Sequence, residues 1–240
     1  MGVTGKLLEF LLDLAFPRAC PMCDRPVPVG EGRICVECRR KIVYIREPVC
    51  LKCGKKLVDE AQIMCSECEQ RPHQYEQGMA LYDYQSVVSA IFRYKYKNRR
   101  DYGKFFGEDL ARHFGEQIRA WKIDAIIPVP LSAKREKERG YNQAKIIAKS
   151  LGESLDIPVY CDYIRRIRHT KPLKKLDYIT RQNNLKNAFL IPEDDVKLKR
   201  VLLVDDIYTT GSTIDAISEE LKMHGVRGVY FVTLSIGEGL

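Results

Sequence analysis

The spacing of apolar residues changes near residue 72 and divides the chain into two parts. Beyond this point, stretches with apolar residues at every third or fourth position alternate with short continuous apolar runs. The runs predict buried strands, and their alternation with helices predicts an α/β fold built on a parallel sheet. The expected strands are residues 79–82, 123–129, 201–204 and 229–236, with at least one more in 157–164; the expected helices are residues 86–96, 102–121, 142–155 and 212–224.

The first 17 residues have an apolar pattern of their own. Two acidic residues interrupt it and no small-residue cleavage site follows, so we expect an amphipathic helix over residues 1–17 that packs on the protein, rather than a secretion signal. No apolar run approaches the roughly 20 residues that span a bilayer, and we expect a cytoplasmic protein. The residues at helical spacing are Leu7, Leu8, Leu11, Leu12 and Ala15.

Eight of the nine cysteines form four C-x-x-C pairs, and the last two pairs repeat the first two at an offset of 30 residues. Such a pair can direct two thiolates at one ion, and two pairs supply the four soft ligands of a tetrahedral zinc site. We therefore expect a double zinc ribbon over residues 18–72 that holds two structural Zn²⁺ ions, followed by the second domain over residues 73–240. The expected ligands are Cys20, Cys23, Cys35, Cys38, Cys50, Cys53, Cys65 and Cys68.

Other uses of these cysteines fit the pattern less well. A disulfide framework needs an oxidising compartment, one redox pair does not explain four at a fixed period, and the spacing is not that of an iron–sulfur cluster. His73 follows the last pair, but four cysteines per site already suffice. The repeat favours two sequential ligand sets, although the equal gaps between pairs leave an interleaved arrangement open.

The segment VLLVDDIYTTGST, residues 201–213, combines a buried strand, two acids, a hydroxyl-rich turn and the start of a helix. Backbone amides and hydroxyls at a helix N-terminus bind phosphate, and Gly211 allows close approach of the backbone. Asp205 and Asp206 stand where they can accept hydrogen bonds from sugar hydroxyls or meet a hydrated Mg²⁺ ion. The segment is not a Walker A loop, because Gly-Lys-Ser/Thr is missing. An N-capped helix without a ligand is the alternative.

Basic residues exceed acidic ones by eight, which fits a phosphate-rich ligand or nucleic acid. Residues 93–104 combine cations with Tyr94, Tyr96 and Tyr102, a pattern that suits single-stranded nucleic acid because bases stack on rings. Ordinary packing of these tyrosines in a helix is the alternative. The cations expected to bind nucleic acid are Lys95, Lys97, Arg99 and Arg100.

Residues 201–213 resemble the signature of type I phosphoribosyltransferases that binds 5-phosphoribosyl-1-pyrophosphate (PRPP). Residues 126–144 (IIPVPLSAKREKERGYNQA) resemble the pyrophosphate-binding region of that fold, and residues 165–189 resemble its mobile loop. Together with the zinc ribbons, these segments are similar to the ComF family of bacterial competence proteins. One difference is that Leu173 occupies a position where family members often carry glutamine.

The resemblance implies a type I phosphoribosyltransferase fold and a function in natural transformation: PRPP binding, with Mg²⁺, in a protein that handles internalised single-stranded DNA together with other competence proteins. An active phosphoribosyltransferase of nucleotide metabolism or salvage is the alternative, and the acceptor is not identified. A zinc-ribbon adaptor leaves residues 201–213 unexplained. The residues expected to bind PRPP are Val204, Asp205, Asp206, Thr209, Thr210, Gly211, Ser212, Thr213 and Arg139. Those expected to act in catalysis are Asp205, Asp206, Arg168 and Arg181.

Overall fold

The structure is a computed structural model that describes residues 18–28, 30, 32–167, 185, 188–192 and 197–237. The expected N-terminal helix over residues 1–17 lies outside this part of the chain, as do Arg168 and Arg181.

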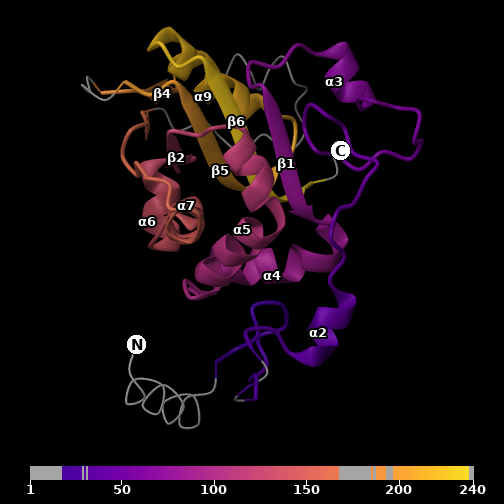
Figure 1. The fold of residues 1–240 in the computed structure, drawn as a ribbon. Helices are drawn as coiled ribbons and strands as arrows, with labels where there is room; N and C mark the ends of the chain where they lie inside the picture. Colours follow the sequence, from indigo (N-terminus) through magenta and orange to yellow (C-terminus); the bar gives the residue numbers. More distant parts are fainter. Residues whose placement is uncertain are drawn as a thin grey trace.

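A four-stranded parallel sheet, with the strand order β1-β6-β5-β2, forms the centre of the described chain (Figure 1). The fold class expected from the apolar pattern is therefore confirmed. Nearly every residue of the two central strands is buried, because helices cover both faces of the sheet. The strands are β1 (Gln77–Tyr82), β2 (Ala125–Pro128), β5 (Arg200–Tyr208) and β6 (Gly228–Ile236).

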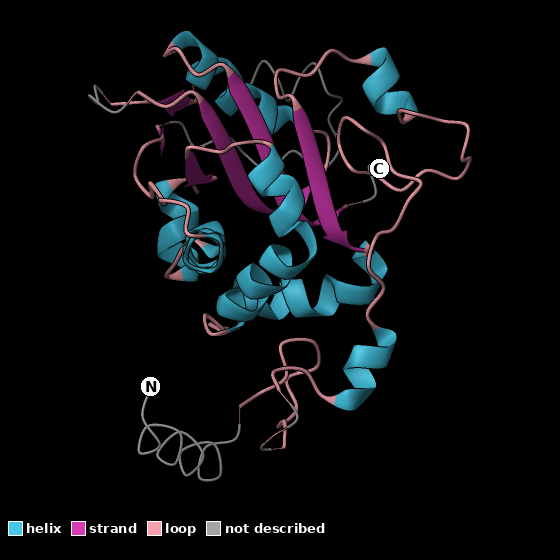
Figure 2. Cartoon of the chain, viewed as in Figure 1, coloured by secondary structure: helices cyan, strands magenta, loops and turns pink. Residues whose placement is uncertain are grey.

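Helices and ribbons surround this sheet (Figure 2). Helices α5 and α7 pack on each other and, with α4, cover one face, while α9 packs on the other. Their bounds are α4 (Tyr84–Tyr96), α5 (Tyr102–Ala120), α6 (Ala133–Arg139), α7 (Gln143–Leu155) and α9 (Ser212–Met223). The ribbons contain the short helices α2 (Val36–Lys41) and α3 (Ser66–Gln70).

The sheet separates two hydrophobic cores, since successive side chains of a strand point to opposite faces. On β5, Leu202 and Val204 join the core beneath α4, α5 and α7, whereas Val201 and Leu203 join the core beneath α9. The cysteines divide in the same way: Cys20 and Cys38 are part of the first core, and the cysteines from Cys50 to Cys68 are part of the second. The first ribbon therefore packs on the helices that cover one face of the sheet, and the second joins the core of the other face beside the edge strand β1.

Residues 157–164 differ from the sequence expectation. Among them, only Val159 makes a β-bridge, with Ile126 at the edge of the sheet. Pro158 has no amide hydrogen to donate to a ladder, so the segment contacts β2 at one point and then turns away. The two-residue strands β3 (Arg165–Arg166) and β4 (Phe189–Leu190) follow as an antiparallel pair.

Candidate functional site

The hydroxyl-rich turn lies at the carboxyl edge of the sheet, between the end of β5 and the start of α9. Gly211 has a φ of +76°, a left-handed conformation that favours glycine. The hydroxyls of Thr210 and Ser212 lie 3.0 Å apart. Ser212 begins α9, so the free amides of the first helical turn follow the turn directly. Open parallel sheets bind ligands at this edge.

Asp205 and Asp206 lie in the last part of β5, two residues before this turn begins. Burial raises the pKa of Asp205 to about 7, and the charge of Asp206 acts in the same direction. The backbone amide of Asp206 donates to Asp205 Oδ1 at 2.8 Å and opposes the increase. Val204 is fully buried and its carbonyl accepts a hydrogen bond from the amide of Val129, which fixes the backbone of β5 just before the two acids.

Lys95 of α4 contacts this acidic pair. Its Nζ lies 2.7 Å from Asp206 Oδ1, and only 16% of the Lys95 side chain and 11% of the Asp206 side chain are exposed. Lys95 also lowers the pKa of Asp205. Because the two partners are 111 positions apart in the sequence, the spacing of charges gave no indication of this ion pair. Lys95, which we expected at a nucleic-acid surface, thus lies in the candidate phosphate site.

The segment after β2 brings Arg139 to the same edge. Arg139 lies close enough to Asp205 to lower the pKa of that carboxyl. Its guanidinium donates to Gln143 Oε1 at 2.9 Å and to the Tyr96 hydroxyl at 3.3 Å. Asn142 donates to the carbonyl of Val129 at 3.0 Å, which fixes the start of α7 against the end of β2.

The β3–β4 pair carries a further cation, Arg166, which lies at the start of the segment that resembles the mobile loop. Arg166 is close enough to Asp205 for their charges to interact, and burial lowers the pKa of Arg166. Its guanidinium also lies over the Phe189 ring, 5.5 Å from the ring centroid. Lys95 thus contacts the acidic pair directly, and the charges of Arg139 and Arg166, from two further elements, act on Asp205.

The other cations expected to bind nucleic acid lie just beyond α4. Arg99 pairs with Asp24 of the first ribbon at 2.7 Å. Arg100 donates to the Gly140 carbonyl at 2.8 Å and lies over the Tyr141 ring. Lys97 is exposed.

The three tyrosines among these cations have different surroundings. Tyr94 and Tyr102 are buried in the core, as the packing alternative held. Tyr96 is 56% exposed and its ring lies 5.1 Å from that of Phe92, which is 54% exposed. An exposed aromatic pair on α4 therefore replaces the row of three rings that the sequence suggested.

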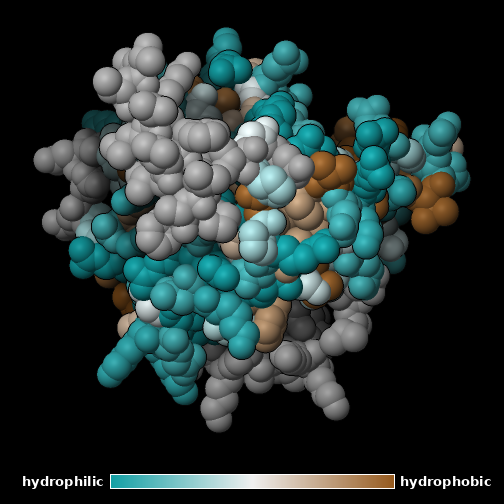
Figure 3. Space-filling view, turned by 90° about the horizontal axis from the view of Figure 1, so that it is seen from below, coloured by the Kyte–Doolittle hydropathy of each residue, from teal (hydrophilic) through white to brown (hydrophobic). Residues whose placement is uncertain are grey.

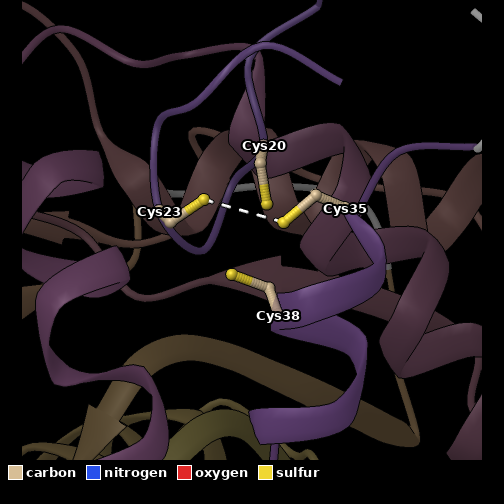
Figure 4. Close-up of side chains that lie close together, drawn as sticks. All are labelled: Cys20, Cys23, Cys35 and Cys38. Carbon is tan, nitrogen blue, oxygen red and sulfur yellow. Dashed lines mark hydrogen bonds between the residues drawn. The ribbon is translucent and has the colours of Figure 1, made fainter. Parts of the chain in front are cut away.

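The eight paired cysteines form two separate clusters, and within each cluster the four sulfur atoms lie within 4.8 Å of one another. Figure 4 shows the sulfurs of Cys20, Cys23, Cys35 and Cys38 directed at a common centre. A Zn–S bond of about 2.3 Å implies tetrahedral S···S separations of about 3.8 Å. The separations Cys23–Cys35 and Cys53–Cys65 are both 3.8 Å. The ligand sets are therefore sequential, and both fit zinc.

None of the described helices is long and apolar enough to cross a membrane. The face viewed from below, where α4 and the first ribbon lie in Figure 1, is mainly hydrophilic in its described part and has small hydrophobic patches (Figure 3).

Comparison with known families matches both parts of the chain. A phosphoribosyl transferase domain model matches residues 107–236, more than half of the chain, and a double zinc ribbon model matches residues 11–69. The class that fold and site define is thus a phosphoribosyltransferase-domain protein with an N-terminal double zinc ribbon.

Named relatives identify the branch of this class. The chain is 30% identical to the DNA utilization protein YhgH of Escherichia coli O157:H7 over 164 residues, which cover 67% of this chain and 72% of that protein. It is 43% identical to Competence protein F of Haemophilus influenzae over 108 residues, or 44% of this chain and 47% of that protein. It is 30% identical to Competence protein ComFC of Bacillus subtilis over 139 residues, or 58% and 55% of the two chains. The chain belongs to the ComF family.

Solved structures of phosphoribosyltransferases are also among those similar to this chain. The purine phosphoribosyltransferase of Pyrococcus horikoshii Ot3 is 26% identical, over 57% of this chain and 73% of that one, with a TM-score of 0.35. A TM-score this low adds nothing to the assignment made from the sheet and the family models.

Proposed function

We propose that the chain binds PRPP with Mg²⁺ at the carboxyl edge of β5 and β2. The observation that supports this most strongly is the order of groups along the chain: two carboxylates lie near the end of β5, and two residues later the hydroxyls and free amides of residues 209–213 follow. Ribose hydroxyls suit the carboxylates, and a 5′-phosphate suits the turn. The pyrophosphate then lies toward Arg139, with Arg168 and Arg181 as further cationic partners.

Calorimetric titration with PRPP and Mg²⁺ tests this proposal on wild type, Asp205→Asn and Asp206→Asn. Loss of one charged hydrogen-bond acceptor costs about 1.5–3 kcal/mol, so we expect each variant to bind roughly 10- to 100-fold more weakly. Glu219→Gln, an exposed acid-to-amide change on α9, is the matched control and should bind like wild type. Equal affinities in all four proteins would contradict the proposal.

We propose further that the protein handles single-stranded DNA in a cytoplasmic step of natural transformation. Two relatives carry names that refer to competence, and another is named for DNA utilization. The exposed Phe92–Tyr96 pair supports direct binding, because it offers rings for stacking. Arg139 lies over the Tyr96 ring, and the exposed cations Lys97 and Arg100 follow α4 in the chain.

Fluorescence anisotropy with a labelled single strand tests this second function. Affinity should fall steeply with salt, and Tyr96→Ala should weaken binding because one base loses a stacking partner, worth about 1–3 kcal/mol. Lys97→Ala/Arg100→Ala should reduce the salt dependence, whereas Lys122→Ala/Arg227→Ala, near the amino ends of β2 and β6, should change it less. Binding that is insensitive to salt and to all these variants would reject a direct role in DNA binding.

Turnover as a phosphoribosyltransferase is the alternative use of the same site. The anomeric carbon of PRPP would be attacked by an acceptor as pyrophosphate leaves, and the cations around Asp205 would stabilise the developing negative charge on pyrophosphate. Release of pyrophosphate from PRPP in the presence of bases or amines would favour this alternative, and binding without release would favour the DNA-handling function.

A further inference from the structure

The second zinc ribbon is built into the edge of the sheet. All four of its cysteines are buried, whereas Cys23 and Cys35 of the first ribbon are partly exposed. The amide of Gly78 in β1 donates to the carbonyl of Lys52, which lies between two of these cysteines, at 2.9 Å. Gly54 has a φ of +78°, and a Cβ at this position would lie 2.8 Å from the Gly78 carbonyl. The metal-binding turn and the first strand are therefore in close backbone contact.

Two buried tyrosines connect this ribbon to the phosphate turn. Lys52 donates to the carbonyl of Tyr75, which is fully buried. The hydroxyls of Tyr75 and Tyr208 are hydrogen-bonded at 2.8 Å, and both rings pack on Phe231 with centroids at 4.9 Å. Tyr208 is the last residue of β5, so its hydroxyl holds the backbone immediately before Thr209.

A second connection runs from the same segment to the first turn of α9. His73 Nδ1 lies 2.8 Å from Asp215 Oδ2, and the amide of Gln74 donates to Asp215 Oδ1 at 2.8 Å. The side chains of His73 and Asp215 are each only 2% exposed. Asp215 is the fourth residue of α9, and its own amide donates to Gly211 at 2.8 Å. The helix end that would face the phosphate is thus anchored to the chain that leaves the second ribbon.

The side chains of Tyr208 and His73 pack directly against the backbone of the turn at Gly211. A Cβ at Gly211 would lie 2.6 Å from the Tyr208 hydroxyl and 3.1 Å from His73 Cε1. Among the described residues, the first ribbon contacts α4, α5 and the turn between them rather than residues 208–215: Asp24 contacts Arg99 and Tyr102, and the Met22 carbonyl accepts from Arg93.

We propose that the second zinc ribbon is a structural part of the PRPP site, with His73 and Tyr75 as positioning residues for the phosphate turn, so that zinc in this ribbon and PRPP in the turn stabilise each other. This inference rests on the proposed PRPP binding. Thermodynamic linkage makes this effect reciprocal. If loss of zinc weakens PRPP binding by a given factor, PRPP must strengthen zinc binding by the same factor. The first ribbon does not take part in this coupling.

The test follows zinc release to a colorimetric chelator from the full-length protein, with and without PRPP and Mg²⁺. Release from wild type should occur in two phases, and PRPP should slow one of them severalfold. Cys35→Ser removes the first zinc site, and the remaining phase in this variant should be the one that PRPP slows. This measurement on wild type does not depend on whether substitutions in the second ribbon allow folding.

Calorimetry with Tyr75→Phe and His73→Gln completes the test, because both variants retain most of the packing. Each should bind PRPP severalfold more weakly and lose part of the protection of zinc by PRPP. Tyr102→Phe, which removes the matching hydroxyl donor to Asp24 at the first ribbon, should show neither effect.

Two different results separate a failure of the coupling from a failure of PRPP binding. If wild type binds PRPP, but zinc release is unchanged and both variants bind as wild type does, the coupling is refuted while the proposed function stands. If wild type does not bind PRPP at all, both are overturned.

Discussion

Replacing Asp205 by asparagine should make the protein more stable at alkaline pH while weakening its ligand binding. In the folded chain, burial and the charge of Asp206 raise the pKa of Asp205 to about 7, compared with about 3.9 for an exposed aspartate. The folded state therefore binds a proton that the unfolded state has lost, and stability falls as pH rises from about 4 to about 7. Below about pH 4, Asp205 is protonated in both states and does not lower the stability of the fold. Above about pH 7, it is ionised in both states and lowers the stability by the full amount.

The size of this effect follows from the two pKa values. A difference of about 3 pKa units corresponds to about 4 kcal/mol once both states are ionised. Between pH 5 and pH 8, the part of this cost that develops is about 2.5 kcal/mol. The amide introduced by Asp205→Asn cannot ionise, so the variant escapes the cost while keeping a side chain of the same shape. Residues selected for binding often reduce stability in this way.

Urea unfolding at pH 5 and pH 8, with zinc held constant, measures the difference. Between pH 5 and pH 8, the free energy of unfolding should fall by about 2.5 kcal/mol more in wild type than in Asp205→Asn. The zinc thiolates also titrate, but they do so in both proteins and cancel from the comparison. Glu219→Gln, on the exposed surface of α9, should follow wild type. If wild type and Asp205→Asn show the same pH dependence, the pKa of Asp205 is not raised in the folded protein and the electrostatic description of the site is wrong.

Three further outcomes follow from the same contacts. Lys95→Met leaves Asp206 without its 2.7 Å partner, so urea unfolding should show a loss of stability of about 3 kcal/mol at pH 8; an unchanged midpoint would show that the pair is not formed in solution. Gly211→Ala forces an L-residue to adopt a φ of +76° beside the Tyr208 hydroxyl, costing about 1–2 kcal/mol; calorimetry should show weaker PRPP binding, and wild-type affinity would mean that the turn moves freely. Cys23→Ser should reduce the zinc content measured by native mass spectrometry from two ions to one, since the clusters share no ligand; loss of both ions would argue against independent sites.

Features encoded by neighbouring residues were predictable from the sequence. The turn at residues 209–213 follows a buried strand and opens a helix, so its place at the carboxyl edge of the sheet followed from the apolar pattern alone. The repeat of the C-x-x-C pairs favoured the sequential ligand sets, and the structure was needed to exclude the interleaved arrangement. Both depend on short segments whose geometry is set locally.

Features that depend on distant partners were not predictable. The ion pair of Lys95 with Asp206 and the contact of His73 with Asp215 join residues more than 100 positions apart, and no local pattern reports such contacts. His73 was considered only beside the nearest cysteines. The burial of Tyr94 and Tyr102 likewise depends on how α4 and α5 pack against the sheet. The apolar pattern of a helix does not determine this packing.

The central claim is that the turn after β5 holds the phosphate of a sugar-phosphate ligand. A crystal structure of the protein with PRPP and Mg²⁺ tests it most directly. The account predicts the 5′-phosphate against the amides of residues 210–213, with the ribose hydroxyls at Asp205 and Asp206. Electron density for PRPP at any other place, with this turn unoccupied at saturating ligand, would contradict it.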